Sequence, residues 1–144
     1  MRVIGLLCVG SLLLVVSTVP AQMPTPQPVG TMGELMMSMT HPAANEILLS
    51  AHRGGPETDS QWRAIQRAAV LLGESGNVMM MSGRALDQGN WIREARSLVD
   101  VATAAYRAAG DRDGNALVAL SEPLSASCIE CHKLYRPDVH PPRP

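Results

Sequence analysis

The residues Cys128-Ile129-Glu130-Cys131-His132 form a C-x-x-C-H sequence near the C-terminus, and no other feature constrains the chain as much. Two cysteines and a histidine at positions i, i+3 and i+4 share one face of an α-helix. From such a face both thiols can form thioethers with one porphyrin while the imidazole reaches its iron. The spacing therefore predicts one covalently attached haem c per chain, with His132 as the proximal ligand of the iron.

Two other interpretations of these residues are a zinc site and a thiol redox pair. Zinc would need a fourth ligand, and the nearby candidate, His140, lies in a proline-rich stretch without zinc-finger spacing. A redox pair of the thioredoxin type would accompany a β-α-β pattern, and the sequence shows none. We therefore favour haem.

The first 21 residues are typical of a signal peptide. Met1-Arg2 precedes an apolar run from Val3 to Val16, and Val19 and Ala21 occupy the −3 and −1 positions of a cleavage site. The run is short for a membrane span and no stop-transfer pattern follows it. We expect cleavage after Ala21, a periplasmic location and no stable membrane insertion; an uncleaved anchor is the alternative.

The composition of the remaining chain limits its chemistry. Cys8 would leave with the signal peptide, so the mature chain keeps only the two cysteines of the motif. Removing Arg2 from the 12 basic residues leaves 11 against 13 acidic ones, and no basic run exists, so nucleic acid is not an expected partner. The chain has no Phe, two Trp and two Tyr. A buried haem would supply the large apolar body that such a core lacks.

The pattern of apolar residues predicts an all-α fold, an antiparallel four-helix bundle with the haem among facing side chains. Residues 22–30 contain three prolines and are expected to form a disordered linker. The bundle would occupy residues 31–136, and residues 137–144 form a proline-rich tail. The four predicted helices run from about Thr31 to His52, from Thr58 or Asp59 to about Gly83, from Trp91 to Ala109 and from about Asn115 to Tyr135.

Prolines should interrupt two of these helices, and glycines mark a third. Pro42 predicts a kink or a break in the first helix. Pro123 predicts either a kink in the last helix or a new segment capped by Ser121. Glycines on the inner face of the second helix, at Gly73, Gly76 and Gly83, would be explained by a closely packed helix, by a flat ligand, or by a break near Gly76.

Polar residues should cap the second and third predicted helices. Thr58 and Gln61 have the spacing of a capping box. Asn90 is expected to cap the third helix, whose inward side chains are predicted to be Ile92, Ala95, Leu98, Val99, Ala102, Tyr106 and Ala109.

The motif and its surroundings resemble the class II cytochromes c, the cytochrome c prime group. That family typically reads C-x-x-C-H-x-x-Tyr/Phe-Arg at the end of the last helix of a four-helix bundle, and here Tyr135-Arg136 follow the motif. The resemblance extends from about Thr31 to Arg136, and away from the motif it is architectural only. It implies that Tyr135 and Arg136 pack beside the proximal histidine, and that a homodimer through the first two helices is to be considered.

One departure from the family concerns the haem propionates. Many members carry an arginine in the first helix that approaches a propionate, and the first helix here has no arginine. Arg63, Arg67 or Arg84 would take that role, or the propionates would face solvent.

The sixth ligand of the iron must lie upstream of His132 or be absent, because no methionine follows that residue. In low-spin relatives the first helix supplies a methionine, whereas an apolar residue there leaves the iron five-coordinate. Met36 and Met39 lie on the inner stripe of the first helix, together with Met32 and Leu35, and are the candidate ligands. Core packing is the alternative role for both, and we favour Met36 slightly.

These features predict an electron carrier that is not an enzyme and that exchanges electrons with a redox partner protein. The competing hypothesis is a five-coordinate haem protein that binds nitric oxide or carbon monoxide. A peroxidase-like enzyme would need a polar acid–base residue on the distal side, and the first helix offers only Glu34, His41 and Glu46.

Overall fold

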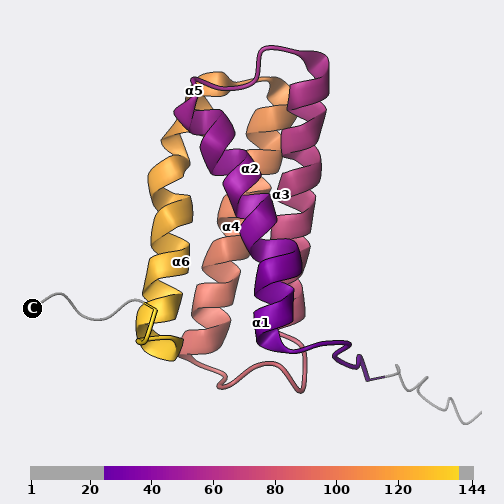
Figure 1. Ribbon diagram of the computed structural model, residues 1–144, viewed down its shortest axis with the longest axis vertical. Coiled ribbons are helices and arrows are strands. Elements are labelled where there is room, and N and C mark those ends of the chain that lie inside the picture. The colour runs from indigo at the N-terminus through magenta and orange to yellow at the C-terminus, as the bar shows by residue number, and fades with distance from the viewer. Residues whose placement is uncertain (1–24, 140–144) are drawn as a thin grey trace, which may run out of the picture.

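The computed structural model describes residues 25–139, which form seven helical segments and no strand. The predicted signal peptide and residues 22–24 and 140–144 of the predicted linker and tail lie outside the described residues. The segments build four long helical units that lie side by side, with consecutive units running in opposite directions (Figure 1). The predicted all-helical architecture of four packed helices is confirmed for this part of the chain.

The first unit begins where a capping box forms. Thr31 donates its backbone N–H to Glu34 Oε2 at 2.7 Å, and the Glu34 N–H donates to Thr31 Oγ1 at 3.2 Å. The unit consists of α1 (Met32–Leu35), the π-helix η1 (Met36–Thr40) and α2 (His41–His52), which follow one another without a gap.

Pro42 does not break this unit. The five residues before His41 form the wider π turn, and the His41 N–H donates to the Met36 carbonyl. Because proline has no N–H and its ring crowds the preceding turn, a wider turn here lets the helix continue into α2. The disruption that the sequence predicts at Pro42 is therefore a π-helical segment immediately before it.

The second unit is α3 (Asp59–Met79), and its predicted capping box is confirmed. The Gln61 N–H donates to Thr58 Oγ1 at 3.3 Å, and the Thr58 N–H donates to Gln61 Oε1 at 2.9 Å. The helix does not break near Gly76. It ends before Gly83, so the expectation that Gly83 lies on its inner stripe is wrong; this residue has φ +84° in the following loop, where glycine is favoured.

The third unit is α4 (Asn90–Asp111), and two expectations about it are wrong. Gly89, not Asn90, is the N-cap residue, and the Asp87 side chain accepts hydrogen bonds from the N–H groups of Gly89 and Trp91. Tyr106 is 47% exposed and does not face the core. The aspartate two residues before the N-cap therefore supplies the side-chain acceptor at the start of this helix.

The last unit consists of α5 (Gly114–Ala119) and α6 (Ser121–Tyr135). Of the two alternatives at Pro123, the structure shows a new segment with this proline in its first turn. Ser121 is the first residue of α6 rather than its cap, and no side chain caps this helix.

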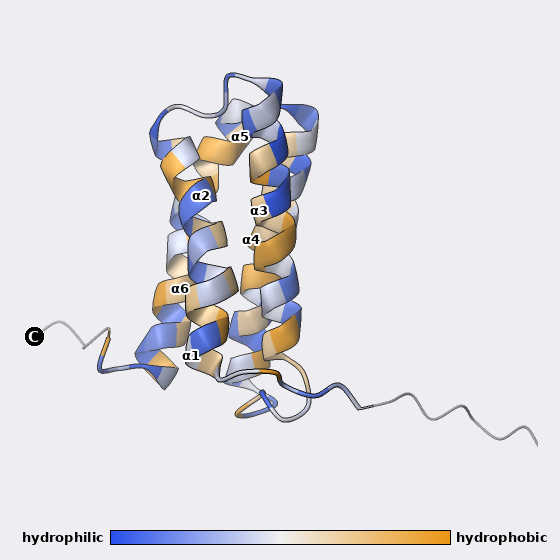
Figure 2. Cartoon of the chain, turned by 45° about the vertical axis from the view of Figure 1, so that its right-hand side comes forward, coloured by the Kyte–Doolittle hydropathy of each residue, from blue (hydrophilic) through white to orange (hydrophobic). Residues whose placement is uncertain are grey.

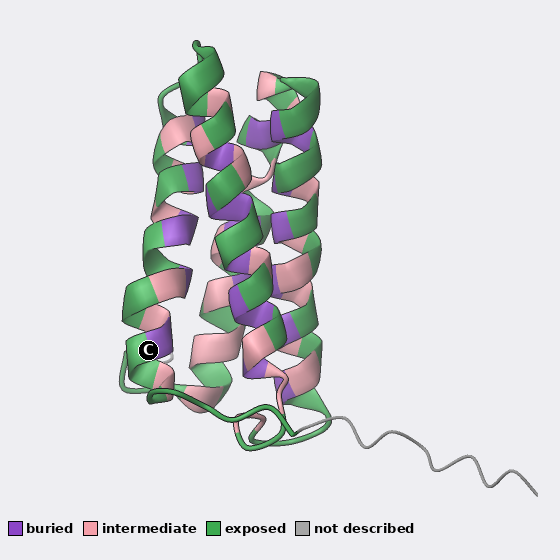
Figure 3. Cartoon of the chain, turned by 90° about the vertical axis from the view of Figure 1, so that its right-hand side faces the viewer, coloured by how far each residue is buried: buried purple, intermediate pink, exposed green. Residues whose placement is uncertain are grey.

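Small residues dominate the core of the bundle. Ten of the nineteen buried apolar residues in the described part are alanines. Hydrophobic residues are spread along all four units, and the buried ones line their inward faces (Figures 2 and 3). Four pairs of helices pack against each other in a ring, α2 on α3, α3 on α4, α4 on α6 and α6 on α2. Alanine allows such helices to approach closely because it adds little volume.

Of the glycines in the described chain, Gly76 of α3 leaves the least room for a Cβ atom. A Cβ atom on Gly76 would lie 2.7 Å from Val99 Cγ2 and 3.2 Å from the Ala95 carbonyl oxygen, both in α4. A Cβ atom on Gly73 would lie 3.5 Å from Ala102 Cβ, which is an ordinary contact. A closely packed helix therefore explains why glycine is needed at position 76.

Gly76→Ala should lower the free energy of unfolding by about 1 kcal/mol, because overpacking against α4 costs about 1–3 kcal/mol and exceeds the gain of about 1 kcal/mol in helix propensity. Gly73→Ala is the matched control and should raise stability by up to about 1 kcal/mol, since its Cβ has room. Denaturant unfolding of both variants measures the difference. Equal stabilisation by both substitutions would contradict the close approach.

Candidate functional site

The C-x-x-C-H motif lies in the last two turns of α6, in regular α-helix. Cys128, Cys131 and His132 are all half-buried, and the two cysteines are free thiols that form no disulfide with each other. The positions i, i+3 and i+4 therefore place both sulfur atoms and the imidazole on one side of a helix. Two unpaired thiols beside a histidine are the donor set that thioether attachment of a haem requires.

Both thiols are held in their protonated form. Burial raises the pKa of Cys128. Burial, followed by the nearby charges of Glu94 and Cys128, raises the pKa of Cys131 to about 11. The Glu94 side chain is only 11% exposed and pairs with Arg93 at 2.8 Å. Since the thiolate is the reactive form, the folded chain protects the two sulfur atoms from alkylation and oxidation at neutral pH.

The end of α6 is joined to α4 by an aromatic pair. The rings of Tyr135 and Trp91 meet edge to face, with centroids 4.9 Å apart and an interplanar angle of 77°. Trp91 is 5% exposed and donates its indole N–H to the Met79 carbonyl at 2.8 Å. Edge-to-face pairs add stabilisation beyond the area that they bury. This pair therefore fixes the last turn of α6 against the ends of α3 and α4.

Asp87 binds the hydroxyl group of Tyr135. The Tyr135 hydroxyl donates to Asp87 Oδ2. This hydrogen bond is the main reason that the pKa of Asp87 is lowered. The pKa of Tyr135 is raised to about 12, first by removal from solvent and then by its bond to Asp87. Both groups therefore keep their charge states, carboxylate and neutral phenol, at neutral pH.

The inner face of α6 is incompletely covered at the motif. Leu124 and Ser127 are the two buried residues of the helix, and no residue of α6 after Ser127 is buried. In contrast, α3 and α4 each bury seven residues, from Ile65 to Met79 in α3 and from Trp91 to Ala109 in α4. The half of α6 that carries the motif thus presents a side that the rest of the described chain does not fully cover.

The methionines of the first unit are placed as the sequence predicts. Met32, Met36 and Met39 are half-buried and pack against the core, whereas Met37 is 68% exposed. The start of α1 and the end of α6 lie at the same end of the bundle (Figure 1). The structure brings both candidate distal ligands to the end of the bundle that holds the motif.

The arginines proposed for the propionates occupy two different places. Arg63 and Arg67 lie in the first half of α3 and line an apolar groove on the outer face of the bundle, with Tyr106. Arg84 lies in the loop between α3 and α4, at the end where α6 finishes. Its Nε atom is buried and has no hydrogen-bond partner among residues 25–139. Of the three, Arg84 is the arginine at the motif end.

Arg136 and His41 are exposed, and their side chains contact residues outside the motif. Arg136 is exposed, and its guanidinium pairs with Asp138 at 3.0 and 3.1 Å, so its side chain is turned toward the tail. His41 is exposed and lies 3.3 Å from the Asn45 amide nitrogen. His140 lies outside the described residues.

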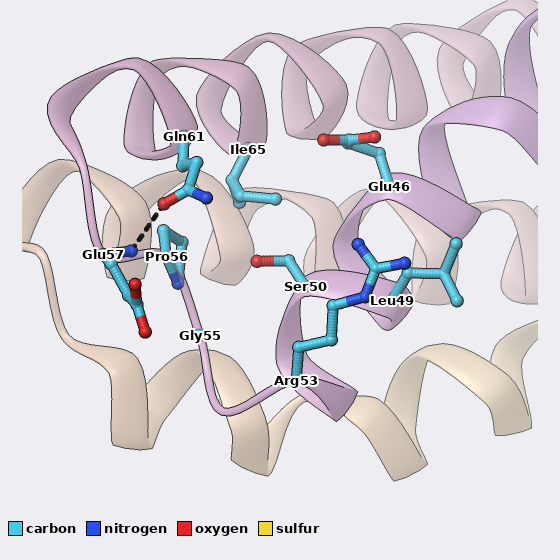
Figure 4. A pocket seen from close by; sticks show the side chains of 9 residues that line it. All are labelled: Glu46, Leu49, Ser50, Arg53, Gly55, Pro56, Glu57, Gln61 and Ile65. Carbon is cyan, nitrogen blue, oxygen red and sulfur yellow. Dashed lines mark hydrogen bonds between the residues drawn. The ribbon is translucent and has the colours of Figure 1, made fainter.

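Apart from the motif, the described chain offers no cluster of metal ligands, but it holds a cleft. Within residues 25–139, no group of three or more His, Cys, Asp and Glu side chains could hold a metal ion, and no helix is long and apolar enough to cross a membrane. A cleft of about 280 Å³ lies between α2 and α3, at the opposite end from the motif (Figure 4). Its wall includes Arg53 and Gln61, whose amide oxygen accepts the Glu57 N–H at 2.8 Å.

No protein-family model, curated protein or solved structure matches this chain.

Sequence reasoning missed Asp87 and Glu94. An aspartate shortly before a helix is a capping signal, so the contact of Asp87 with α4 could have been found. Its contact with Tyr135 joins residues 48 positions apart and needs the fold. Glu94 gives no signal, because an acidic residue in a helix is usually solvated.

The raised pKa of Cys131 predicts how the haem-free folded chain reacts with iodoacetamide. At pH 8 a pKa of about 11 in place of 9.0 leaves about 100-fold less thiolate. Alkylation of Cys131 should therefore rise about tenfold for each pH unit up to about 11. The same chain in denaturant is the control and should level off near pH 9. Mass spectrometry of the labelled peptide gives both profiles, and a folded profile that levels off near pH 9 would show that Cys131 is not protected.

Proposed function

We propose that this chain is an exported c-type cytochrome of the class II kind, which carries electrons through one haem attached to Cys128 and Cys131. His132 is the proximal ligand of the iron. The observation that carries the proposal is the half-covered face of α6, on which two free thiols and an imidazole lie together. The proposed export relies on residues 1–21, which lie outside the described residues.

The residues at the motif end fit a covalently held haem. The thiols form no disulfide, and no residue of α6 after Ser127 is buried, whereas α3 and α4 each bury seven residues. A haem against this face would complete an alanine-rich core that has few large side chains. The bound haem supplies a one-electron couple, and the chain orients it and limits its access to water.

Two further residues have proposed roles toward the haem. Arg84 offers a guanidinium with an unpartnered buried Nε at the motif end, so it suits a propionate better than Arg63 or Arg67 does. Met36 or Met39 supplies the thioether on the distal side. Imidazole and thioether together stabilise the ferrous form and raise the reduction potential, as an electron carrier requires.

The competing proposal is a protein that binds nitric oxide or carbon monoxide at a five-coordinate iron. One observation favours it, which is that Met36 and Met39 pack against the core and could serve as apolar cover. The two proposals share the covalent haem and differ only in the distal ligand.

Covalent attachment is tested by acid–acetone extraction of the purified protein. The haem should stay with the denatured polypeptide, because thioether bonds survive the treatment. A Cys128→Ala, Cys131→Ala double variant should lose covalent haem and much of its stability, since small domains depend on such cofactors. Release of free haem from the unaltered protein would refute the proposal.

The distal ligand is tested by the spin state of the ferric protein. Met36→Ala should convert a low-spin spectrum to high-spin and let carbon monoxide bind quickly to the ferrous form, because an axial position becomes open. Met37→Ala is the matched control and should change little, since Met37 is 68% exposed. An effect of Met39→Ala alone would move the ligand to Met39. A high-spin unaltered protein that binds carbon monoxide readily would favour the gas-binding proposal.

A further inference from the structure

We propose that Asp87 is a positioning residue for the haem site, which acts through Tyr135 to hold the end of α6 against α4. This inference rests on the proposed function, because its consequence is the orientation of a haem attached to α6. Asp87 does not touch the motif itself. Its hydrogen bonds reach the helix that carries the motif and the helix that lies beside it.

Both oxygens of the Asp87 carboxylate are used, and they bind different elements. Oδ1 accepts the N–H of Gly89 at 2.7 Å and that of Trp91 at 3.1 Å, which caps the start of α4. Oδ2 accepts the Tyr135 hydroxyl in the last turn of α6. Hydrogen bonds to an ionised acceptor are stronger than neutral ones. A single carboxylate therefore links the first turn of α4 to the last turn of α6.

Trp91 makes this link rigid. Its backbone N–H binds Asp87, its indole N–H binds the Met79 carbonyl at the end of α3, and its ring packs on Tyr135. Three helix ends thus meet at one buried indole. Tyr135 cannot shift without losing both its ring contact and its hydrogen bond.

The position of Tyr135 matters because it lies one helical turn after His132. The Arg136 N–H donates to the His132 carbonyl at 2.7 Å, so the backbone stays helical between the two residues. Nearby ion pairs do not anchor this turn to another helix, since Lys133 pairs with Glu130 and Arg136 pairs with Asp138. The half of α6 that carries the motif also buries no side chain after Ser127. The link through Tyr135 therefore sets how this half of the helix lies on α4.

The test is a double-mutant cycle on the holoprotein with Asp87→Ala and Tyr135→Phe. Tyr135→Phe keeps the ring and alters no charge, so its effect reports the hydrogen bond alone. It should lower the midpoint potential and reduce the circular dichroism of the haem absorption band, because a less firmly held α6 lets water approach the haem. In the Asp87→Ala background the same substitution should have no further effect.

Asp138→Asn controls for loss of a carboxylate near the end of α6, and it should leave the Tyr135→Phe effect intact. Asp87→Asn, which can still accept the α4 N–H groups, should give a smaller change than Asp87→Ala. The inference is overturned if the Tyr135→Phe variant has the midpoint potential and haem circular dichroism of the unaltered protein. It is also overturned if Tyr135→Phe shifts the midpoint potential equally with Asp87 present and with Asp87→Ala. An unaltered protein without covalent haem would instead refute the proposed function. If Asp87→Ala does not fold, Asp87→Asn replaces it in the cycle.

Discussion

The packing of α3 on α4 is the contact on which the rest of the bundle depends. Gly76 lets the two helices approach until a single methyl group would clash with Val99. The alanines of both helices extend this contact, and each helix buries seven residues. The first unit and α6 then pack on this pair, and α2 also contacts α6.

Buried residues are unevenly distributed among the four helical units. The buried residues of α3 and α4 include seven alanines. The first unit carries Met32, Met36 and Met39, α6 carries Cys128 and Cys131, and all five side chains are half-buried. Covalent attachment on α6 would place a large apolar group against side chains that the described chain covers only in part.

Local signals in the sequence predicted most of the fold. Apolar periodicity located the four units, and the pair Thr58 and Gln61 located the start of α3, since both signals act within one or two turns. Two expectations about α4 failed. Asp87 accepts N–H groups at the start of α4, where Asn90 was expected to be the cap, and Tyr106 lies exposed beside outer side chains of α3. The motif residues could be chosen from spacing alone, whereas the partner of Tyr135 could not, because it lies in a loop far away in the sequence.

The π turn at Met36–Thr40 has a geometric consequence for the first unit. A π turn holds one residue more than an α turn, and each residue advances a helix by about 100°. The extra residue therefore sets the rotational phase of α1 relative to α2. With a plain α turn at this place, the side chains before it would be rotated by about a quarter of a revolution against the alanines of α2. One inserted residue near Pro42 thus determines which side of the first unit faces the bundle. Whether Met32 and Met36 point inward depends on this rotation as well as on their places in the sequence.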